Sequence, residues 1–131
     1  MSFVFSAPVR FGHCDPAGIA YFPRLFELVD AAIEDWTAAA IGVARAEMHG
    51  PLRLGLPTVD LHAGFTTPCR LGEVLDIDVE ATALGTTSID LCAAASVAGA
   101  RRFTVRLKQV LMNLDTARPV PWPDEWRARL A

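Results

Sequence analysis

A short loop near the start of the chain gathers residue types that suit acid–base or nucleophilic chemistry. His13, Cys14 and Asp15 stand directly before the tripeptide Pro-Ala-Gly at positions 16–18. A carboxylate can attack an activated carbonyl carbon or take a proton from water, so Asp15 is the first candidate. Asp before Pro is also common in plain turns, which leaves a structural role for Asp15 open. Cys14 would need a base beside it, and its neighbour His13 is expected to point the other way.

The residues after this loop predict a long helix whose first amides face the loop. Apolar side chains recur at helical spacing, namely Phe22, Leu25, Phe26, Val29, Ile33 and Trp36, with charged residues between them. This pattern predicts about four to five turns that include Leu25 to Trp36. Pro23 suits the first turn but has no N–H to donate. No Ser, Thr, Asp or Asn caps this start, so the first amides, including that of Phe22, need another acceptor.

Most of the remaining chain predicts strands. Segments of alternating apolar and polar residues are typical of half-buried strands, and short turns between them favour antiparallel pairing. The expected strands lie at residues 3–11, 59–64, 75–83, 88–97 and 102–108. The alternation becomes unclear near Gln109, which indicates a bulge. One long helix against one face of a five-stranded antiparallel sheet is an α+β architecture. The other face, which is polar, needs cover, so we expect an oligomer with a wet interface.

Length and composition exclude several classes of protein. The 131 residues fit one domain over residues 1–131, and 52% of them are hydrophobic. A net charge of -3 argues against binding to nucleic acid. The apolar start of the chain lacks the basic region and long apolar run of a signal peptide, and no apolar stretch is long enough to cross a membrane. Three cysteines without metal-ligand spacing predict reduced thiols in the cytoplasm and no metal site.

The stretch from Phe11 to Pro23, with its Asp-Pro-Ala-Gly loop, resembles the signature of the 4-hydroxybenzoyl-CoA thioesterase family. In that family an Asp lies before a Pro/Ala-Gly turn, just ahead of a long central helix. The segments 60–68, 72–76 and 115–123 are also similar to the family's strands and tail. The resemblance covers most of the chain, and the loop is specific for the family rather than for one substrate.

The resemblance implies a hotdog fold, in which a curved antiparallel sheet wraps around the long helix. It also implies a homodimer with two active sites at the subunit interface, often paired into a homotetramer, and no cofactor. The substrate would be an acyl-CoA, hydrolysed to a free acid and CoA. Asp15 would be the nucleophile or the general base, and the backbone N–H of Phe22 would polarise the thioester carbonyl. The family often has His or Tyr where this chain has Phe22, so no side-chain acid or base is expected there.

Further residues are candidates for binding the substrate. Gly18 lets the backbone approach a ligand closely. Tyr21 is expected to form a wall of the acyl pocket, with core packing as the alternative. Asp60 and His62 share one face of a predicted strand, and in the family this strand runs beside the acyl pocket. A solvated or intersubunit face is the alternative for these two residues.

Basic residues are candidates for binding the phosphates of CoA, since the guanidinium fork suits phosphate. Arg70 and Arg102 are the two that we assign to this role. Arg102 belongs to a basic stripe with Arg106 and Lys108. Pairing of this stripe with acidic residues on neighbouring strands is the alternative; the acids are Asp76, Asp78, Glu80 and Asp90.

The leading hypothesis is therefore an acyl-CoA thioesterase, with an aromatic acyl group as the first substrate to test. Short aliphatic acyl-CoA, or an acyl group on a carrier protein, is nearly as well supported. A hotdog protein that binds acyl-CoA without turning it over is a second hypothesis, although a pure binder has no need for Asp15. A dehydratase built on His62 and Asp60 is a third.

Overall fold

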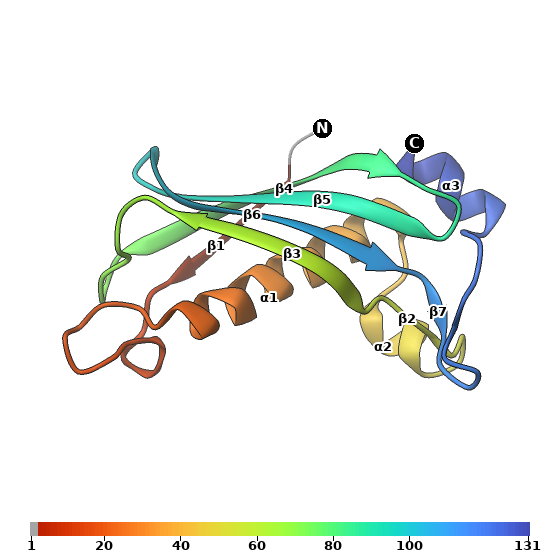
Figure 1. The fold of residues 1–131 in the computed structure, drawn as a ribbon, viewed down its shortest axis with the longest axis horizontal. Coiled ribbons are helices and arrows are strands. Elements are labelled where there is room, and N and C mark those ends of the chain that lie inside the picture. Colours follow the sequence, from red (N-terminus) through yellow and green to blue (C-terminus); the bar gives the residue numbers. More distant parts are fainter. Residues whose placement is uncertain (1–2) are drawn as a thin grey trace.

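A curved antiparallel sheet wraps around one long helix (Figure 1). The computed structural model describes residues 3–131, so positions 1 and 2 of the predicted domain lie outside the described residues. The large sheet has the strand order β1-β4-β5-β6-β3. Its strands are β1 (Phe3–Pro8), β4 (Val74–Leu84), β5 (Ser88–Val97), β6 (Ala100–Val110) and β3 (Thr58–Phe65). This arrangement confirms the predicted α+β class and the hotdog fold.

The central helix α1 (Phe22–Ile41) is longer than the predicted core of Leu25 to Trp36. It ends at Gly42, whose φ of 75° is the left-handed conformation that commonly closes a helix. Its residues Leu25, Val29 and Ile33 are almost fully buried against the sheet. Within residues 3–131, no helix combines the length and hydropathy needed to cross a membrane.

Short elements surround this centre. The predicted first strand ends early, at Pro8, and a 3-10 helix covers Phe11–His13. Strands β2, β7 and β8 form a second, three-stranded sheet near the short helix α2. The bounds are α2 (Arg45–His49), β2 (Leu54–Gly55), β7 (Met112–Asn113), β8 (Arg118–Pro119) and α3 (Asp124–Leu130). Periodicity missed α2 and the small sheet, because two to five residues carry too little pattern.

The core lies between α1 and the inner face of the sheet. Every second residue of β4, β5 and β6 points inward, as the pleat of a strand requires. The inward residues exposed by 2% or less are Leu75, Ile77, Val79, Ile89, Leu91, Ala93, Ala95, Phe103 and Val105. Burial of this apolar surface is the main force that holds α1 in the curve of the sheet.

Gln109 does not mark a bulge in its own strand, as the sequence suggested. It continues the inward alternation of β6 and is only 2% exposed. The irregularity lies opposite, in β3, between Thr58 and Asp60. The Nε2 of Gln109 donates to Thr58 Oγ1 at 3.4 Å, while its buried Oε1 has no partner within the described residues. A polar residue at an inward position made the phase hard to read.

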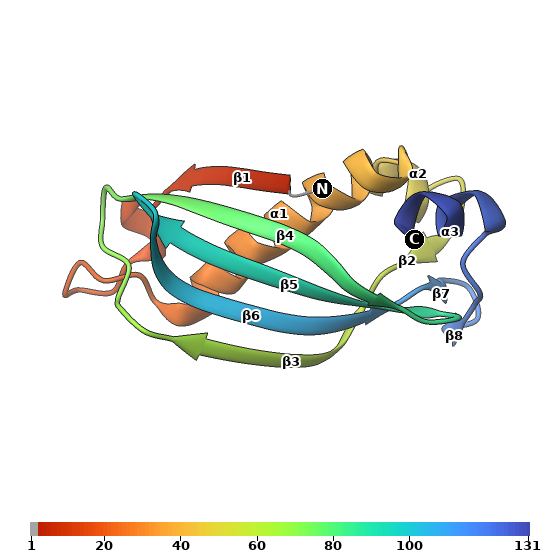
Figure 2. The same cartoon turned by 90° about the horizontal axis from the view of Figure 1, so that it is seen from above.

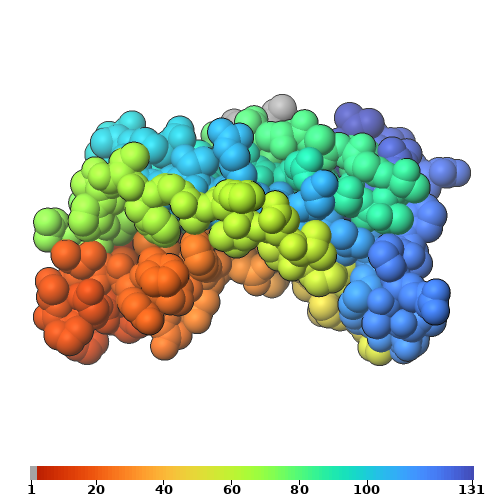
Figure 3. All heavy atoms as spheres, viewed as in Figure 1, coloured from red at the N-terminus to blue at the C-terminus, as the bar shows by residue number. Residues whose placement is uncertain are grey.

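The strand β3 is an edge strand with uncovered apolar side chains. All eight of its residues are exposed, although an apolar inner face was predicted to be buried. Leu61 and Phe65 pair with the inward residues Leu107 and Phe103 of β6, so they face the helix side. Val59 is 58%, Leu61 39% and Phe65 46% exposed. The spheres of β3 lie open along the front of the molecule in Figure 3. The helix covers the middle of the sheet and leaves this edge free.

Candidate active site

The loop that carries Asp15 is a small, well-defined hairpin. Cys14 and Ala20 form an antiparallel bridge across it, and the amide of Tyr21 donates to the carbonyl of His13 at 2.8 Å. At its tip the Gly18 amide donates to the Asp15 carbonyl at 3.0 Å, which closes a tight turn. Gly18 has a φ of 77°, a left-handed conformation that only glycine adopts easily. The Pro-Ala-Gly tripeptide therefore determines the shape of the turn.

One oxygen of the Asp15 carboxylate is held by the turn itself. Oδ1 accepts from the Ala17 amide at 2.9 Å and from the Ile19 amide at 3.4 Å. Within residues 3–131, Oδ2 has no hydrogen-bond partner. Asp15 thus stabilises the turn, which is the structural role expected of an Asp before Pro. The same hydrogen bonds fix the orientation of the carboxylate and leave its second oxygen able to react.

The other arm of the hairpin leads directly into α1. Tyr21 occupies the cap position without a side-chain hydrogen bond, and Pro23 follows in the first turn. The amides of Ala20, Tyr21 and Arg24 donate to backbone carbonyls, but among the described residues none accepts from the Phe22 amide. This free N–H lies at the positive end of a 20-residue helix, where it can stabilise a developing oxyanion.

A second segment, residues 69–71, holds the hairpin in place through backbone contacts. The Ala20 amide donates to the Cys69 carbonyl at 2.7 Å, and the Leu71 amide donates to the Gly18 carbonyl at 3.1 Å. Ile19 and Arg70 form an antiparallel bridge between these two contacts. The hairpin is therefore attached to residues 69–71, and its position depends on theirs.

Glu73 and Arg102 lock this second segment. Nη1 and Nη2 of Arg102 donate to the two carboxylate oxygens of Glu73 at 2.8 and 2.7 Å, and Nη1 also donates to the Pro68 carbonyl. The Arg70 amide donates to Glu73 Oε1 at 2.6 Å. The Arg102 guanidinium, with the Arg70 amide, lowers the pKa of the Glu73 carboxyl. Because these contacts engage both Nη groups of Arg102, a two-pronged contact of these groups with a CoA phosphate would require the pair to open.

Two hollows adjoin the hairpin. Cys14 lines one of them, and its bridge partner Ala20 lines the other. Asp15, Pro16, Phe11 and Leu71 help to line a hollow of about 630 Å³. An apolar hollow of about 260 Å³ lies at the start of α1, lined by Ala20, Phe22, Leu25, Phe65, Thr66, Thr67, Pro68 and Cys69. Asp15 and Phe22 thus line separate hollows of the single chain.

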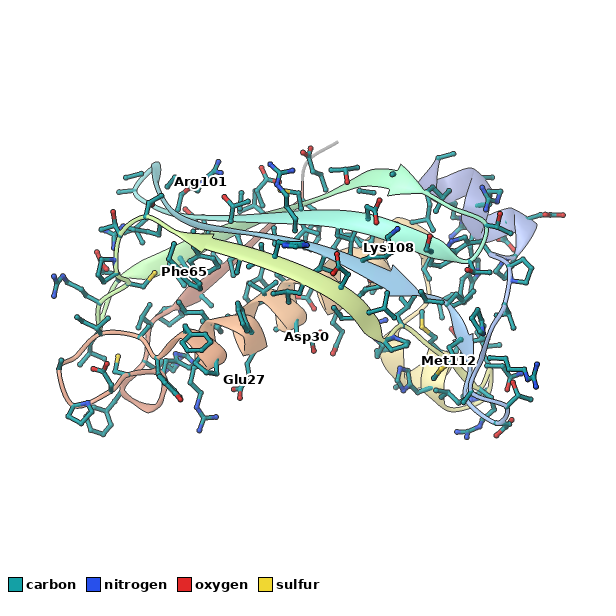
Figure 4. All side chains as sticks on the ribbon, in the orientation of Figure 1. Glu27, Asp30, Phe65, Arg101, Lys108 and Met112 are labelled. Carbon is teal, nitrogen blue, oxygen red and sulfur yellow. The ribbon has the colours of Figure 1, made fainter. Side chains whose placement is uncertain are left out.

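The apolar hollow has aromatic walls. The rings of Phe22 and Phe26 pack edge to face at 5.8 Å, and Phe65 lies 6.5 Å from Phe22. Figure 4 shows Phe65 between β3 and the start of α1. Burial raises the pKa of the Cys69 thiol, so this residue contributes a neutral, weakly nucleophilic wall.

Some of the predicted site residues lie at the hairpin of Asp15, and others lie away from it. Gly18, Tyr21 and Phe22 belong to the hairpin of Asp15 or its junction with α1, and Arg70 is exposed beside it. Asp60 and His62 pair with each other at 3.4 Å and stand opposite Lys108 and Arg106 of β6, on the outer face of the sheet. The single chain therefore does not bring Asp60 or His62 to Asp15, and their contact with substrate stays a prediction.

Two residues near Asp15 are occupied by local contacts. Nδ1 of His13 accepts from the Arg10 amide at 2.9 Å, and the Cys14 thiol donates to the Arg10 carbonyl at 3.4 Å. His13 thereby closes the 3-10 turn, and neither contact activates the Cys14 thiol. Sequence reasoning missed Phe65 and Glu73. Phe65 extends the alternation of its strand by one step, whereas no local pattern shows that Glu73 pairs with a residue 29 positions away.

Comparison with known proteins agrees with this fold. A family model described as the Thioesterase-like superfamily matches residues 9–130. A 1,4-dihydroxy-2-naphthoyl-CoA hydrolase of Synechococcus elongatus is 34% identical over 82 residues, which are 62% of this chain and 60% of that relative. The aligned part thus spans less than two thirds of that relative.

Solved structures are similar over nearly the whole chain. A thioesterase superfamily protein from Jannaschia sp. CCS1 has a TM-score of 0.90 and 28% identity, covering 98% of this chain and 90% of its own. A mutant 4-hydroxybenzoyl CoA thioesterase in complex with 4-hydroxybenzoyl CoA has a TM-score of 0.91 over 99% of both chains. At 19% identity, that second likeness shows the fold alone. Since the family model spans residues 9–130, the chain belongs to the Thioesterase-like superfamily.

Proposed function

We propose that this protein is an acyl-CoA thioesterase, which converts acyl-CoA and water to a carboxylic acid and free CoA. The observation that carries the proposal is the hairpin of residues 13–21. It orients the Asp15 carboxylate through its own turn and ends at the free Phe22 amide of a long helix. A reactive carboxylate and an oxyanion donor on one rigid element are a minimal set for thioester hydrolysis.

In this mechanism the thioester lies across the hairpin between the two hollows, so that its carbonyl oxygen accepts from the Phe22 amide while its carbonyl carbon faces Asp15. Negative charge that develops on this oxygen is stabilised by the N–H and by the helix dipole. Asp15 acts through Oδ2 in one of two ways. It attacks the carbonyl carbon, releases the CoA thiolate and leaves a mixed anhydride for water to cleave, or it takes a proton from the attacking water.

The proposed acyl group is aromatic. The hollow beside Phe22 is apolar and bordered by the rings of Phe22 and Phe65, which suit a flat ring. Two proteins similar to this chain are named for aromatic acyl-CoA substrates, hydroxybenzoyl and dihydroxynaphthoyl. Short aliphatic acyl-CoA and acyl carrier protein are the alternatives. Of the two arginines predicted to bind the CoA phosphates, Arg70 is the proposed contact, because it is exposed beside the hairpin. We propose that Arg102 instead supports residues 69–71 through its pair with Glu73.

We further propose that the working unit is a homodimer joined along β3. An edge strand with exposed Val59, Leu61 and Phe65 offers unpaired backbone groups and apolar surface to an identical strand. A second copy on this edge would also enclose the open hollow near Phe22. The proposed location is the cytoplasm, a reducing compartment that suits the three free cysteines.

The direct test is release of free thiol from a panel of CoA esters. The panel contains benzoyl, hydroxybenzoyl and phenylacetyl esters beside short and long aliphatic ones, with the acyl carrier protein form of the best ester. Turnover that is fastest with an aromatic ester supports the proposal. Tight binding without thiol release would favour the non-catalytic binder, and enoyl product from 3-hydroxyacyl-CoA would favour the dehydratase.

A further inference from the structure

The hollow beside Asp15 is wide and has mainly apolar walls. It measures about 630 Å³, and Phe11, Pro16, Ala17 and Leu71 are among the residues that line it. Figure 2 shows the segment of residues 9–21 beyond the end of the sheet, beside the turn that joins β3 to β4. With the acyl group in the hollow beside Phe22, the sulfur side of the thioester lies toward this second hollow.

Two apolar side chains of this hollow lack cover within the described part of the chain. Phe11 is 84% and Leu71 is 49% exposed. Neither residue belongs to the hydrophobic core or to the partly buried side chains that pack against it. Their apolar surface therefore contributes little to folding, and a ligand that covers it gains the free energy of its burial.

Backbone hydrogen bonds fix the two apolar walls relative to each other. The Val9 amide donates to the Glu73 carbonyl at 2.7 Å, and the Gly72 amide donates to the Val9 carbonyl at 2.9 Å. These contacts join the segment that leads to Phe11 with the segment that follows Leu71. The hollow between the two side chains is therefore pre-formed, which lowers the entropy that a ligand loses on binding.

The hairpin adds polar acceptors to these walls. Among residues 3–131, the carbonyl oxygens of Pro16 and Ala17 accept no backbone hydrogen bond. A ligand that covers the hollow must supply donors to such oxygens, because a covered polar group without a partner is costly. Amide N–H groups on an otherwise apolar ligand meet this requirement.

An arginine precedes each of the apolar wall residues. Arg10 stands before Phe11, and Arg70 stands before Leu71. Both arginines are exposed, and neither takes part in an ion pair within the described residues. Since guanidinium groups suit phosphate, this side of the hollow can receive a phosphate group.

We propose that the hollow binds the pantetheine arm, the part of the substrate that CoA and acyl carrier protein share. From the thioester sulfur outward, this arm carries two amides, a carbon with two methyl groups and then a phosphate ester. The amide N–H groups donate to the carbonyls of Pro16 and Ala17. The methyl groups pack against Phe11 and Leu71, and the phosphate lies toward the two arginines. The inference rests on the proposed function, which places the thioester between the two hollows.

Shortened thioesters of one acyl group test this site. The CoA ester carries the arm and the nucleotide, the pantetheine ester carries the arm without phosphate, and the N-acetylcysteamine ester keeps only the first amide. The ratio of kcat/KM for the pantetheine ester to that for the N-acetylcysteamine ester is expected to fall about tenfold in Phe11→Ala and in Leu71→Ala. Because both rates come from one variant, the fraction of folded protein cancels from the ratio.

Leu52→Ala is the matched control. Leu52 is 43% exposed and lies just after α2, at the other end of the molecule from the hairpin (Figure 1). This variant should keep the wild-type ratio. A ratio that stays unchanged in both Phe11→Ala and Leu71→Ala would overturn the proposal, and so would equal losses on all three esters. The ester of an acyl carrier protein, compared with the CoA ester, shows which carrier delivers the arm.

A binding measurement separates this inference from the proposed function. If the wild type releases no thiol from any ester, the proposed function fails, yet free CoA should still bind about tenfold more weakly to Phe11→Ala in a calorimetric titration. If the wild type releases thiol but both proteins bind CoA equally, the pantetheine site alone is refuted.

Discussion

Arg102 and Glu73, 29 residues apart in sequence, form a two-pronged ion pair with N–O distances of 2.8 and 2.7 Å. The pair is largely shielded, with side chains 15% and 25% exposed. The pair contacts Pro68, directly before the segment 69–71 to which the Asp15 hairpin is attached, and Arg70, within that segment. We therefore regard Arg102 and Glu73 as positioning residues for the site.

Glu73→Gln is expected to lower both the melting temperature and the rate of thiol release at pH 7. Because Arg102 lowers the pKa of Glu73 in the folded state, the pair stabilises the protein above the usual pKa of Glu, about 4.3. That stabilisation is lost as the pH falls through the folded-state pKa. Thermal unfolding from pH 7 to below 4 should show the gap between wild type and variant closing on acidification.

Glu27→Gln is the matched control for that experiment. Glu27 pairs with Arg24 at 3.0 Å, but their side chains are 64% and 52% exposed, and exposed pairs contribute little to stability. Its melting temperature should be close to that of wild type at every pH. An equal effect of the two substitutions would contradict the positioning role of the Glu73–Arg102 pair.

Gly18→Ala is expected to cost about 1 kcal/mol in the free energy of unfolding, because an L-residue is strained at a φ of 77°. No atom lies within 4 Å of the added Cβ, so the cost comes from the backbone alone. Turnover should fall further than stability accounts for, since the turn orients Asp15. Gly12→Ala, with equal open space and no positive φ, serves as the control in denaturant unfolding. Equal behaviour of the two variants would refute this reading.

Gln109→Leu is expected to stabilise the fold by about 1 kcal/mol, because it removes a buried acceptor that has no partner. The replacement keeps a similar volume at an inward position of β6. Urea unfolding measures the change. A clear loss of stability would mean that the hydrogen bond from Nε2 to Thr58 contributes more than the unpaired Oε1 costs.

The sequence predicted the parts of the fold that depend on periodicity. Alternation located β4, β5 and β6, and the apolar stripe located α1, because each pattern spans at least two turns or several strand residues. Periodicity failed where tertiary contacts determine burial. Gln109 is a polar residue that is nevertheless buried, and β3 is exposed because the helix does not reach that edge.

The candidate site shows the same division. The Asp-Pro-Ala-Gly loop and the free helix start could be predicted, since turn chemistry and capping are local. The sequence could not show which face of the sheet Asp60 and His62 occupy, because this depends on strand pairing and on the bulge beside Asp60. The pairing of Arg102 with Glu73 joins distant segments, so charge pattern alone could not show it, and the contact of Arg102 with CoA phosphate stays a prediction.

Asp15 is the proposed reacting group, and the most direct measurement compares Asp15→Asn with wild type on the best CoA ester. Asp35→Asn, an exposed carboxylate on α1, controls for the loss of charge. We predict that Asp15→Asn loses about 10²-fold or more in kcat while its Kd for the substrate is unchanged, and that Asp35→Asn keeps wild-type activity. Equal kcat for Asp15→Asn and wild type would contradict the account and move the chemistry elsewhere.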